Sequence, residues 1–316
     1  MESKLNRTIP GRGLEPQTPS QSTRVVGLGE AVWDLLPAGK HIGGAPLNFA
    51  YISSLLGGRA VIASRIGADR LGDELQGALS ARGIATGSLQ RDTTLPTGTS
   101  KVRISADGQP RYEIRQKVAW DALESTAEWK ELARQADVVC FGTLAQRSEQ
   151  SRATIAAFLQ ATRPQCVRIF DANLRPPFYS RDMILDSIRL AGIVKFNEEE
   201  LTEVCSTLGL PGCASPHDVR ILATHLGVEL ICVTRGDRGS LLATPRRAVE
   251  HPGFPVKVVD TVGAGDAFAA AVACCWAQQL GLERISVVAN RWAAWVASQH
   301  GAMPLIDEAL RRQMLP

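Results

Sequence analysis

The segment Val258–Asp266 combines residue types that could bind and react with a phosphate group. It reads as the β-branched end of a strand, then the turn Gly263, Ala264, Gly265, then Asp266 at the start of an apolar helix. A helix N-terminus carries unpaired N–H groups and the positive end of the helix dipole, and small residues let a phosphate oxygen approach that backbone. The segment therefore predicts an anion-binding turn next to a candidate general base. The alternative is a purely structural tight turn, in which Asp266 only stabilises the first turn of the helix through the helix dipole.

A second candidate segment is His41–Ala50. Gly43 and Gly44 expose backbone N–H groups where a helix begins, and Pro46 helps to initiate that helix. Asn48 follows in the first turn with two amide donors and one acceptor, which suits a ligand with many hydroxyl groups. The alternative is a glycine-rich loop in front of a core helix.

The elements that must position these residues alternate along the chain. Short apolar, β-branched runs predict strands, and the stretches between them have helical spacing. The predicted strands cover 24–29, 59–66, 137–141, 167–170, 193–196 and 229–234, and the predicted helices cover 47–56, 71–82, 126–135, 151–161, 198–208, 216–226, 264–279 and 283–299. Strands that alternate with helices indicate a parallel sheet covered on both faces.

Two segments interrupt this alternation. Ala31–Ile42 is typical of a short hairpin, and Thr99–Val118 alternates polar and apolar residues around Asp107-Gly108, a strong hairpin signal. These strands are too polar for the inside of a parallel sheet, so we expect a small separate sheet that projects from it. Such a sheet can act as a lid over an active site or as a contact between two copies in a homodimer. The alternative is surface decoration.

The composition excludes several classes of protein. The 316 residues suit one large domain or two modest ones, and a net charge of +3 without a dense Lys/Arg stripe argues against a dedicated nucleic-acid binder. Residues 1–23 are polar and lack an apolar core, so we expect a disordered extension rather than a secretory signal. The chain has no run of 18 apolar residues, hence no expected membrane span.

The seven cysteines favour a reducing compartment, and we expect a cytoplasmic protein. Several lie inside apolar runs, which indicates buried, reduced thiols. Neither the cysteines nor the five histidines show the spacing of a zinc site.

The two glycine-rich motifs together resemble the paired signatures of the ribokinase-like (phosphofructokinase-B type) carbohydrate kinases, over residues 24 to about 305. Further landmarks of this resemblance are 195–200, 234–240 and Asn290, and the segments 29–37 and 170–177 look most like those of fructokinases. The resemblance implies a three-layer α/β/α fold with a mostly parallel central sheet and a small projecting β-sheet lid. It implies a single sugar-kinase domain over 24–316, with lid segments near 31–42 and 97–118.

The resemblance also implies a reaction, the phosphorylation of the primary hydroxyl of a small sugar by ATP, with D-fructose giving fructose 6-phosphate as the first candidate. Asp266 would take the proton of that hydroxyl as it attacks the γ-phosphorus, because an alcohol does not ionise at neutral pH. The backbone of residues 262–265 would stabilise the charge on the transferring group, which is the main catalytic contribution in phosphoryl transfer.

Nucleotide and metal roles follow from the same resemblance. Asn197 and Glu200 match the family's Asn-x-x-Glu motif and would organise Mg²⁺ and phosphates, partly through water. Thr234 and Gly236 would lie near the nucleotide phosphates, and Asn290 would face the adenine. Alternatively, Glu200 only places negative charge in the first turn of a solvated helix, where the dipole favours it. Asn290 could instead face the solvent.

On the sugar side, the resemblance implies contacts from Asp34, Gly43, Gly44 and Asn48, with Arg175 and Arg103 as further candidates. The family often has a monovalent cation site, and the residues that match it here are Asp260, Val262, Val296 and Gly301, so K⁺ is a further expected cofactor.

Three other functions compete with this expectation. A kinase for 2-keto-3-deoxygluconate or another ketose or pentose needs Arg175 or Arg103 in the pocket to bind a carboxylate. A catalytically silent sugar-binding regulator on the same fold is disfavoured because Asp266 and the Gly-Ala-Gly turn are both present. A dinucleotide-dependent dehydrogenase is excluded because no Gly-x-Gly-x-x-Gly follows the first strand.

Overall fold

A computed structural model describes residues 23–36, 39–104, 110–213 and 215–316. Nearly all of the expected N-terminal extension lies outside the described residues, as do the predicted turn residues 37–38 and 106–109.

The described residues form one large sheet in the order β13-β12-β11-β10-β9-β8-β1-β4-β5. Its parallel strands are β1 (Arg24–Leu28), β4 (Arg59–Gly67), β5 (Leu89–Asp92), β8 (Val138–Phe141), β9 (Val167–Asp171), β10 (Ile193–Asn197) and β11 (Leu230–Thr234). The hairpin of β12 (Ser240–Ala243) and β13 (Ala248–His251) adds two antiparallel strands at one edge. The parallel strands place their carboxyl ends along a common edge, where ligands of α/β proteins bind.

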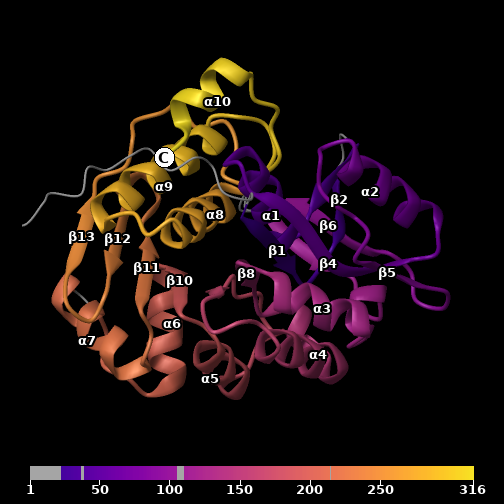
Figure 1. The fold of residues 1–316 in the computed structure, drawn as a ribbon, viewed down its shortest axis with the longest axis horizontal. Coiled ribbons are helices and arrows are strands. Elements are labelled where there is room, and N and C mark those ends of the chain that lie inside the picture. The colour runs from indigo at the N-terminus through magenta and orange to yellow at the C-terminus, as the bar shows by residue number, and fades with distance from the viewer. Residues whose placement is uncertain (1–22, 37–38, 105–109, 214) are drawn as a thin grey trace, which may run out of the picture.

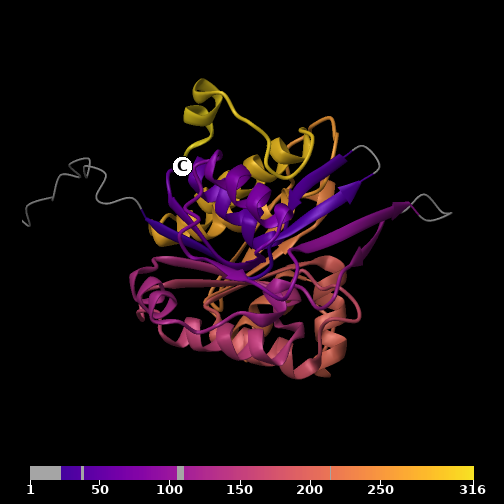
Figure 2. The same ribbon diagram turned by 90° about the vertical axis from the view of Figure 1, so that its right-hand side faces the viewer.

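Helices cover both faces of this sheet (Figures 1 and 2). One face packs against α1 (Ala45–Leu55), α8 (Ala264–Ala277) and α9 (Leu282–Ala297), and the other against α3 (Ala127–Gln135), α4 (Glu149–Gln160), α5 (Arg181–Leu190), α6 (Glu198–Leu208) and α7 (Pro216–Leu226). Neighbouring strand residues point to opposite faces, so Val25 joins the core under α1 and α8 while Val26 joins the core under α3 and α4. The predicted three-layer α/β/α fold is confirmed.

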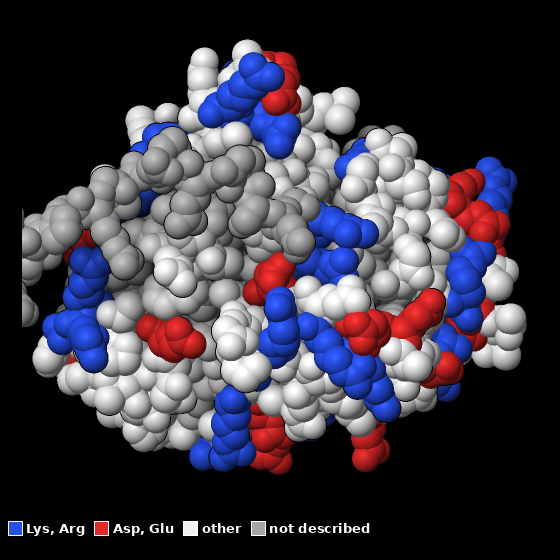
Figure 3. All heavy atoms as spheres, in the orientation of Figure 1, with Lys and Arg blue, Asp and Glu red and all other residues white. Residues whose placement is uncertain are grey.

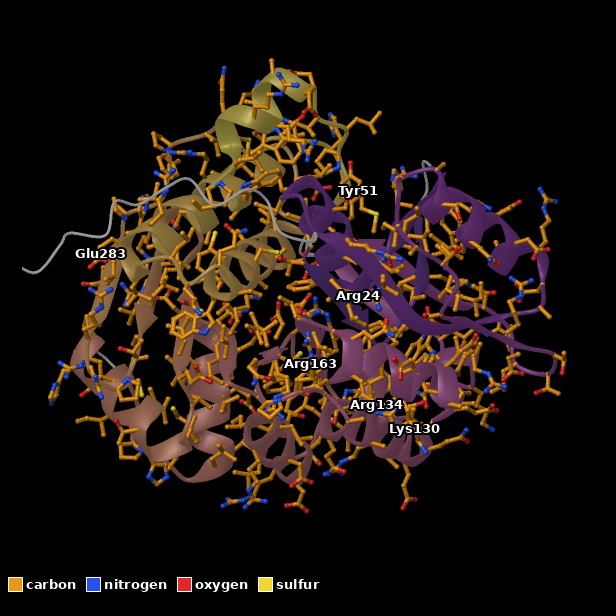
Figure 4. All side chains as sticks on the ribbon, viewed as in Figure 1. Arg24, Tyr51, Lys130, Arg134, Arg163 and Glu283 are labelled. Carbon is orange, nitrogen blue, oxygen red and sulfur yellow. The ribbon has the colours of Figure 1, made fainter. Side chains whose placement is uncertain are left out.

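The C-terminal segment is tied back onto this body. The Tyr51 hydroxyl of α1 donates to the Pro304 carbonyl at 2.7 Å, beside the chain that leads to α10 (Glu308–Met314) (Figure 4). The Trp292 indole of α9 donates to the Met314 carbonyl at 3.0 Å. These two bonds hold both ends of the last segment against helices that border the candidate site.

The small sheet predicted from the polar segments is present, in the order β3-β2-β6-β7, and it projects from the main body (Figure 2). Its strands are β2 (Val32–Leu36), β3 (Gly39–Gly43), β6 (Gly98–Ile104) and β7 (Pro110–Ile114). The Trp33 indole donates to the Leu71 carbonyl at 2.9 Å, which anchors this sheet to α2 (Arg70–Ser80).

One predicted strand is wrong. Val258 and Val259, expected to end a strand before the glycine turn, lie in an irregular segment and are 56% and 42% exposed. The N–H groups of Val259 and Asp260 instead donate to the Ala297 carbonyl at the end of α9. β-branched residues favour strands only where a partner strand is available. Val258 and Val259 pair with no described strand, and Val258 lines the cleft at the carboxyl ends of the parallel strands.

No described helix is long and apolar enough to cross a membrane. Positive and negative side chains are interspersed on the face shown in Figure 3, in keeping with the small net charge of +3.

Candidate active site

A cleft of about 760 Å³ opens at the carboxyl ends of the parallel strands and under the small sheet. Its lining includes residues from both glycine-rich motifs, from Asn197–Glu200 and from the start of α8. The predicted site residues that line it are Asp34, Gly44, Asn48, Arg175, Asn197, Glu200, Thr234, Gly236, Val262, Gly263, Ala264, Gly265, Asp266 and Asn290. The fold therefore brings together residues that are more than 200 positions apart.

Two helices that point at this cleft start without a side-chain cap. Most described α-helices begin at an Asp, Asn, Ser or Thr whose side chain accepts an N–H from the first turn. The caps of α1 and α8 are instead Gly44 (φ +109°) and Gly263 (φ +81°), and neither can make such a bond. The absence of a capping side chain leaves both helix dipoles, and some backbone N–H groups at the start of α8, available to a ligand, as an anion site requires.

The turn before α8 has room for a ligand but not for larger residues. A Cβ on Gly263 would lie 2.4 Å from the Ala302 Cβ, and one on Gly265 would lie 3.0 Å from the Lys195 Nζ. The Val262 N–H donates to Asp260 Oδ1 and the Ala264 N–H donates to the Thr261 carbonyl, so two of the four expected donors have protein partners. The N–H groups of Gly263 and Gly265 have no protein acceptor among the described residues.

Asp266 is joined to the other glycine-rich motif by a hydrogen bond. The Asn48 amide Nδ2 donates to Asp266 Oδ2 at 2.7 Å, and Asn48 Oδ1 is buried without a hydrogen-bond partner among the described residues. Burial raises the pKa of the Asp266 carboxyl, while the Asn48 bond and the charges of Lys195 and Arg175 oppose that rise. A buried acceptor without a partner costs free energy, so Asn48 Oδ1 is a ready acceptor for a ligand hydroxyl.

Asp34, which we expect to contact the sugar, lies on β2 and lines the cleft. Gly43 leaves the space that the carboxylate fills, because a Cβ there would lie 2.0 Å from Asp34 Oδ2. Burial raises the pKa of Asp34 to about 6. The charge of Arg175 acts on Asp34 and on Asp266, which supports its predicted place in the pocket. The side chain of Arg103, on β6, lies outside the described part of the chain.

Glu30 is a cleft residue that the sequence analysis missed. Its Oε1 accepts the Ala45 N–H at 3.3 Å, at the uncapped start of α1, and its Oε2 is buried without a partner among the described residues. Burial raises the pKa of Glu30 to about 7, and the nearby charge of Asp266 adds to the rise. The signal was available, because an acid directly after the first strand lies at the ligand-binding edge of the sheet.

Asn197 and Glu200 form the cap of α6. The Glu200 N–H donates to Asn197 Oδ1 at 2.7 Å, and Glu200 Oε2 accepts the Asn197 N–H at 2.9 Å. Glu200 Oε1 accepts the Leu174 N–H at 3.0 Å. Both carboxylate oxygens thus serve backbone donors and face the cleft. This arrangement suits a Mg²⁺ ion held through water rather than by direct contact, and the metal role of Glu200 stays a prediction.

The part of the cleft that we expect to bind the nucleotide is more apolar. Thr234 and Gly236 line it after β11, and the exposed side chains of Phe254, Val256 and Val258 form one wall. Asn290 of α9 also lines it, but its amide donates to Ser240 Oγ at 2.7 Å and to the Ser286 carbonyl at 2.8 Å. Asn290 is buried rather than solvent-facing, and both of its donors already have protein partners.

The expected cation residues lie together beside the glycine turn. Asp260 Oδ1 accepts the Val262 N–H at 3.0 Å and Asp260 Oδ2 accepts the Gly301 N–H at 3.1 Å, while Val296 is buried in α9. Among the described residues, no cluster of three or more His, Cys, Asp or Glu side chains could hold a metal ion. A K⁺ site built from backbone carbonyls here stays a prediction.

Comparison with known proteins agrees with this geometry. The model of the pfkB family carbohydrate kinases matches residues 36–309. The fructokinase of Salmonella typhimurium is 29% identical, over 87% of this chain and 94% of its own length. Two solved structures superpose closely. An uncharacterized sugar kinase of Pyrococcus horikoshii has a TM-score of 0.80 at 27% identity, covering 93% of this chain and 100% of its own. A fructokinase of Vibrio cholerae O395 with fructose, ADP and calcium bound has a TM-score of 0.77 at 26% identity, covering 93% and 99%. The chain therefore belongs to the pfkB family of carbohydrate kinases.

Proposed function

We propose that this kinase transfers the γ-phosphoryl group of ATP to the primary hydroxyl of D-fructose, with Asp266 as the general base. The observation that carries the proposal is the Asn48–Asp266 hydrogen bond, which places a carboxylate beside the uncapped N-terminus of α8. A sugar hydroxyl at this point would face the base on one side and the anion-binding turn on the other. General bases of this kind are worth roughly 10²–10⁴ in rate.

The electrostatics of the sugar side favour a neutral polyol over a sugar acid. The charged side chains that line the cleft are the cations Arg175 and Lys195 and the acids Glu30, Asp34, Glu200, Asp237 and Asp266, so acids outnumber cations. A substrate carboxylate would add a further acidic group to a site that already holds more acids than cations. Hydroxyl groups can instead donate to the carboxylates and accept from the Asn48 amide. The relatives named fructokinase support the same choice.

Catalysis by this chain then has three parts. The Asp266 carboxylate accepts the hydroxyl proton while the sugar oxygen attacks phosphorus. The free N–H groups of Gly263 and Gly265 stabilise the negative charge of the transferring group. Mg²⁺, when bound with ATP, neutralises phosphate charge, and the Asn197–Glu200 cap would hold it through water.

The alternative substrate is 2-keto-3-deoxygluconate or another ketose or pentose, and the observation in its favour is Arg175 in the cleft lining. A substrate carboxylate would have to compete for Arg175 with Glu30 and Asp34, on both of which the charge of Arg175 acts. The non-catalytic regulator has no structural observation in its favour, since the base and the turn are both in place.

The test is ADP release coupled to a dye assay, with ATP and Mg²⁺, over fructose, ribose, glucose, 2-keto-3-deoxygluconate, adenosine and no sugar. We expect the highest kcat/KM for fructose. Asp266→Asn should lower kcat by roughly 10²–10⁴ with ATP binding retained. Asp182→Asn, the same change in the first turn of α5 and exposed, is the matched control. Full turnover by Asp266→Asn would remove Asp266 from the mechanism, and a preference for the sugar acid would overturn the assignment of fructose.

A further inference from the structure

A buried ion pair lies against the anion-binding turn and has no part in the function described above. The Lys195 Nζ of β10 donates to Asp171 Oδ1 of β9 at 2.9 Å, and the two side chains are 8% and 3% exposed. The Lys195 ammonium also contacts Gly265, the residue before Asp266, because a Cβ on Gly265 would lie 3.0 Å from Nζ. The positive charge is therefore fixed beside the first turn of α8 and at the edge of the cleft.

The Asp266 carboxyl faces polar groups on every element packed around it. They are the Asn48 amide of α1, Glu30 after β1, the neutral thiol of Cys140 on β8, Asp171 on β9, Arg175 after β9, Lys195 on β10 and Glu200 on α6. Three of these groups are carboxyls and two are cations. The acids around Asp266 disfavour its ionised form, and so does its burial.

The charge of Lys195 is well defined in this setting. Burial disfavours the ammonium form, but the carboxyls of Asp171, Glu200 and Asp266 outweigh burial and raise the pKa of Lys195. Lys195 therefore stays positively charged at every pH at which the enzyme would work. Its charge in turn lowers the pKa of Asp266, against the effect of burial.

We propose that Lys195 is a positioning residue, whose buried ammonium, held in place by Asp171, keeps the Asp266 carboxylate ionised and able to accept a proton. A general base acts only in its ionised form, and the partial burial of Asp266 at the edge of the cleft disfavours that form. A buried ion pair adds little net stability compared with packed apolar groups, so a fixed charge beside the base is what this pair supplies to the site. The inference rests on the proposed role of Asp266.

The test follows the ionisation of Asp266 directly. The full-length protein is labelled with ¹³C at the aspartate carboxyl carbons, and the Asp266 resonance is identified by its loss in Asp266→Asn. Lys195→Met should move the Asp266 titration to higher pH by about one to two units, as expected for losing a nearby charge in a partly screened site. Asp171→Asn should move it to lower pH by less than one unit, and the double variant should lie between the two single variants.

Lys195→Met and Asp171→Asn should shift the pKa of Asp266 in opposite directions, which a purely structural role of the ion pair would not produce. If Lys195→Met leaves a lone buried carboxylate and fails to fold, the double variant removes both charges together and still reports on Asp266. Lys130→Met, on the exposed face of α3, is the matched control and should leave the titration unchanged. The same shifts should appear in the acidic limb of kcat/KM, with the KM for ATP unchanged.

Two results would overturn the inference. An Asp266 titration that is the same in Lys195→Met, Asp171→Asn and the parent would show that the pair only supports the fold. A loss of ATP affinity at every pH in Lys195→Met, without a shift, would mean that Lys195 contacts the phosphates instead. Because the resonance is measured without turnover, shifts in a protein that phosphorylates no sugar would sustain this inference and reject the proposed function.

Discussion

Glu30→Gln tests how much the buried Glu30 carboxyl lowers the free energy of unfolding. Burial raises the pKa of Glu30 from its ordinary 4.5 to about 7. Between these two values the folded protein holds a proton that the unfolded chain has already released, so the free energy of unfolding falls as pH rises through this window. Linkage gives a penalty of about 1 kcal/mol at pH 5 and about 3 kcal/mol at pH 8. The glutamine is neutral at both values and keeps an acceptor for the Ala45 N–H.

Urea unfolding at pH 5 and pH 8 measures this penalty. Glu30→Gln should raise the free energy of unfolding above that of the parent, and this increase should be about 2 kcal/mol larger at pH 8 than at pH 5. Glu128→Gln, an exposed glutamate in the first turn of α3, controls for the chemical change itself. An equal difference at the two pH values would refute the reasoning, because it would mean that Glu30 is ionised in the folded protein as it is in water.

Three further outcomes are expected. Asn48→Ala should raise the KM for the sugar by roughly 5- to 150-fold, the worth of hydrogen bonds to a buried polar group, and leave the KM for ATP unchanged; a rise in the ATP value alone would contradict the placement of the two subsites. Gly263→Ala should lower both stability and turnover, because the new Cβ would lie 2.4 Å from the Ala302 Cβ. The control is Gly77→Ala in α2, where a Cβ has open space and should stabilise the protein by about 0.5–1 kcal/mol. Equal effects of the two variants on the free energy of unfolding would contradict the tight packing of the turn. Chelation of Mg²⁺ with EDTA should abolish ADP release, and exchange of Na⁺ for K⁺ should raise it; turnover indifferent to both ions would remove the metal roles of Glu200 and of the Asp260 loop.

Much of the fold could be predicted from local pattern. Six of the seven parallel strands are apolar runs, and the helices between them carry regular spacing, so the predicted elements match the observed ones within a few residues of their ends. The parallel strand β5 was not predicted, because three of its four residues are polar. The strands of the β12–β13 hairpin have only four residues each, too few to show a period. α5 was overlooked although Ser180 caps it and Met183, Ile184, Ser187 and Ile188 are buried at helical spacing.

The residues of the candidate site also fall into those that the local sequence indicates and those that it does not. The glycines, Asp266 and Asn48 could each be selected from the sequence because backbone geometry and reactive groups demand particular residue types, whereas the hydrogen bond between Asp266 and Asn48 could not. The strand predicted at Val258 failed because β-branched residues form strands only beside a partner. Lys195 was not predicted because its importance comes from burial and from neighbours distant in the chain, neither of which a local pattern contains. Glu30 was missed although its place directly after the first strand indicates the ligand-binding edge of the sheet.

These buried charges also bear on how the protein is stabilised. Glu30, Asp34 and Asp266 are all acids whose pKa burial raises, so each opposes folding at neutral pH. A ligand whose hydroxyls donate to these carboxylates would favour their ionised forms and remove part of that cost. Sugar binding should therefore raise the free energy of unfolding more at pH 8 than at pH 5, beyond mass action alone. A sugar whose stabilising effect is the same at both pH values would not be in contact with these carboxyl groups.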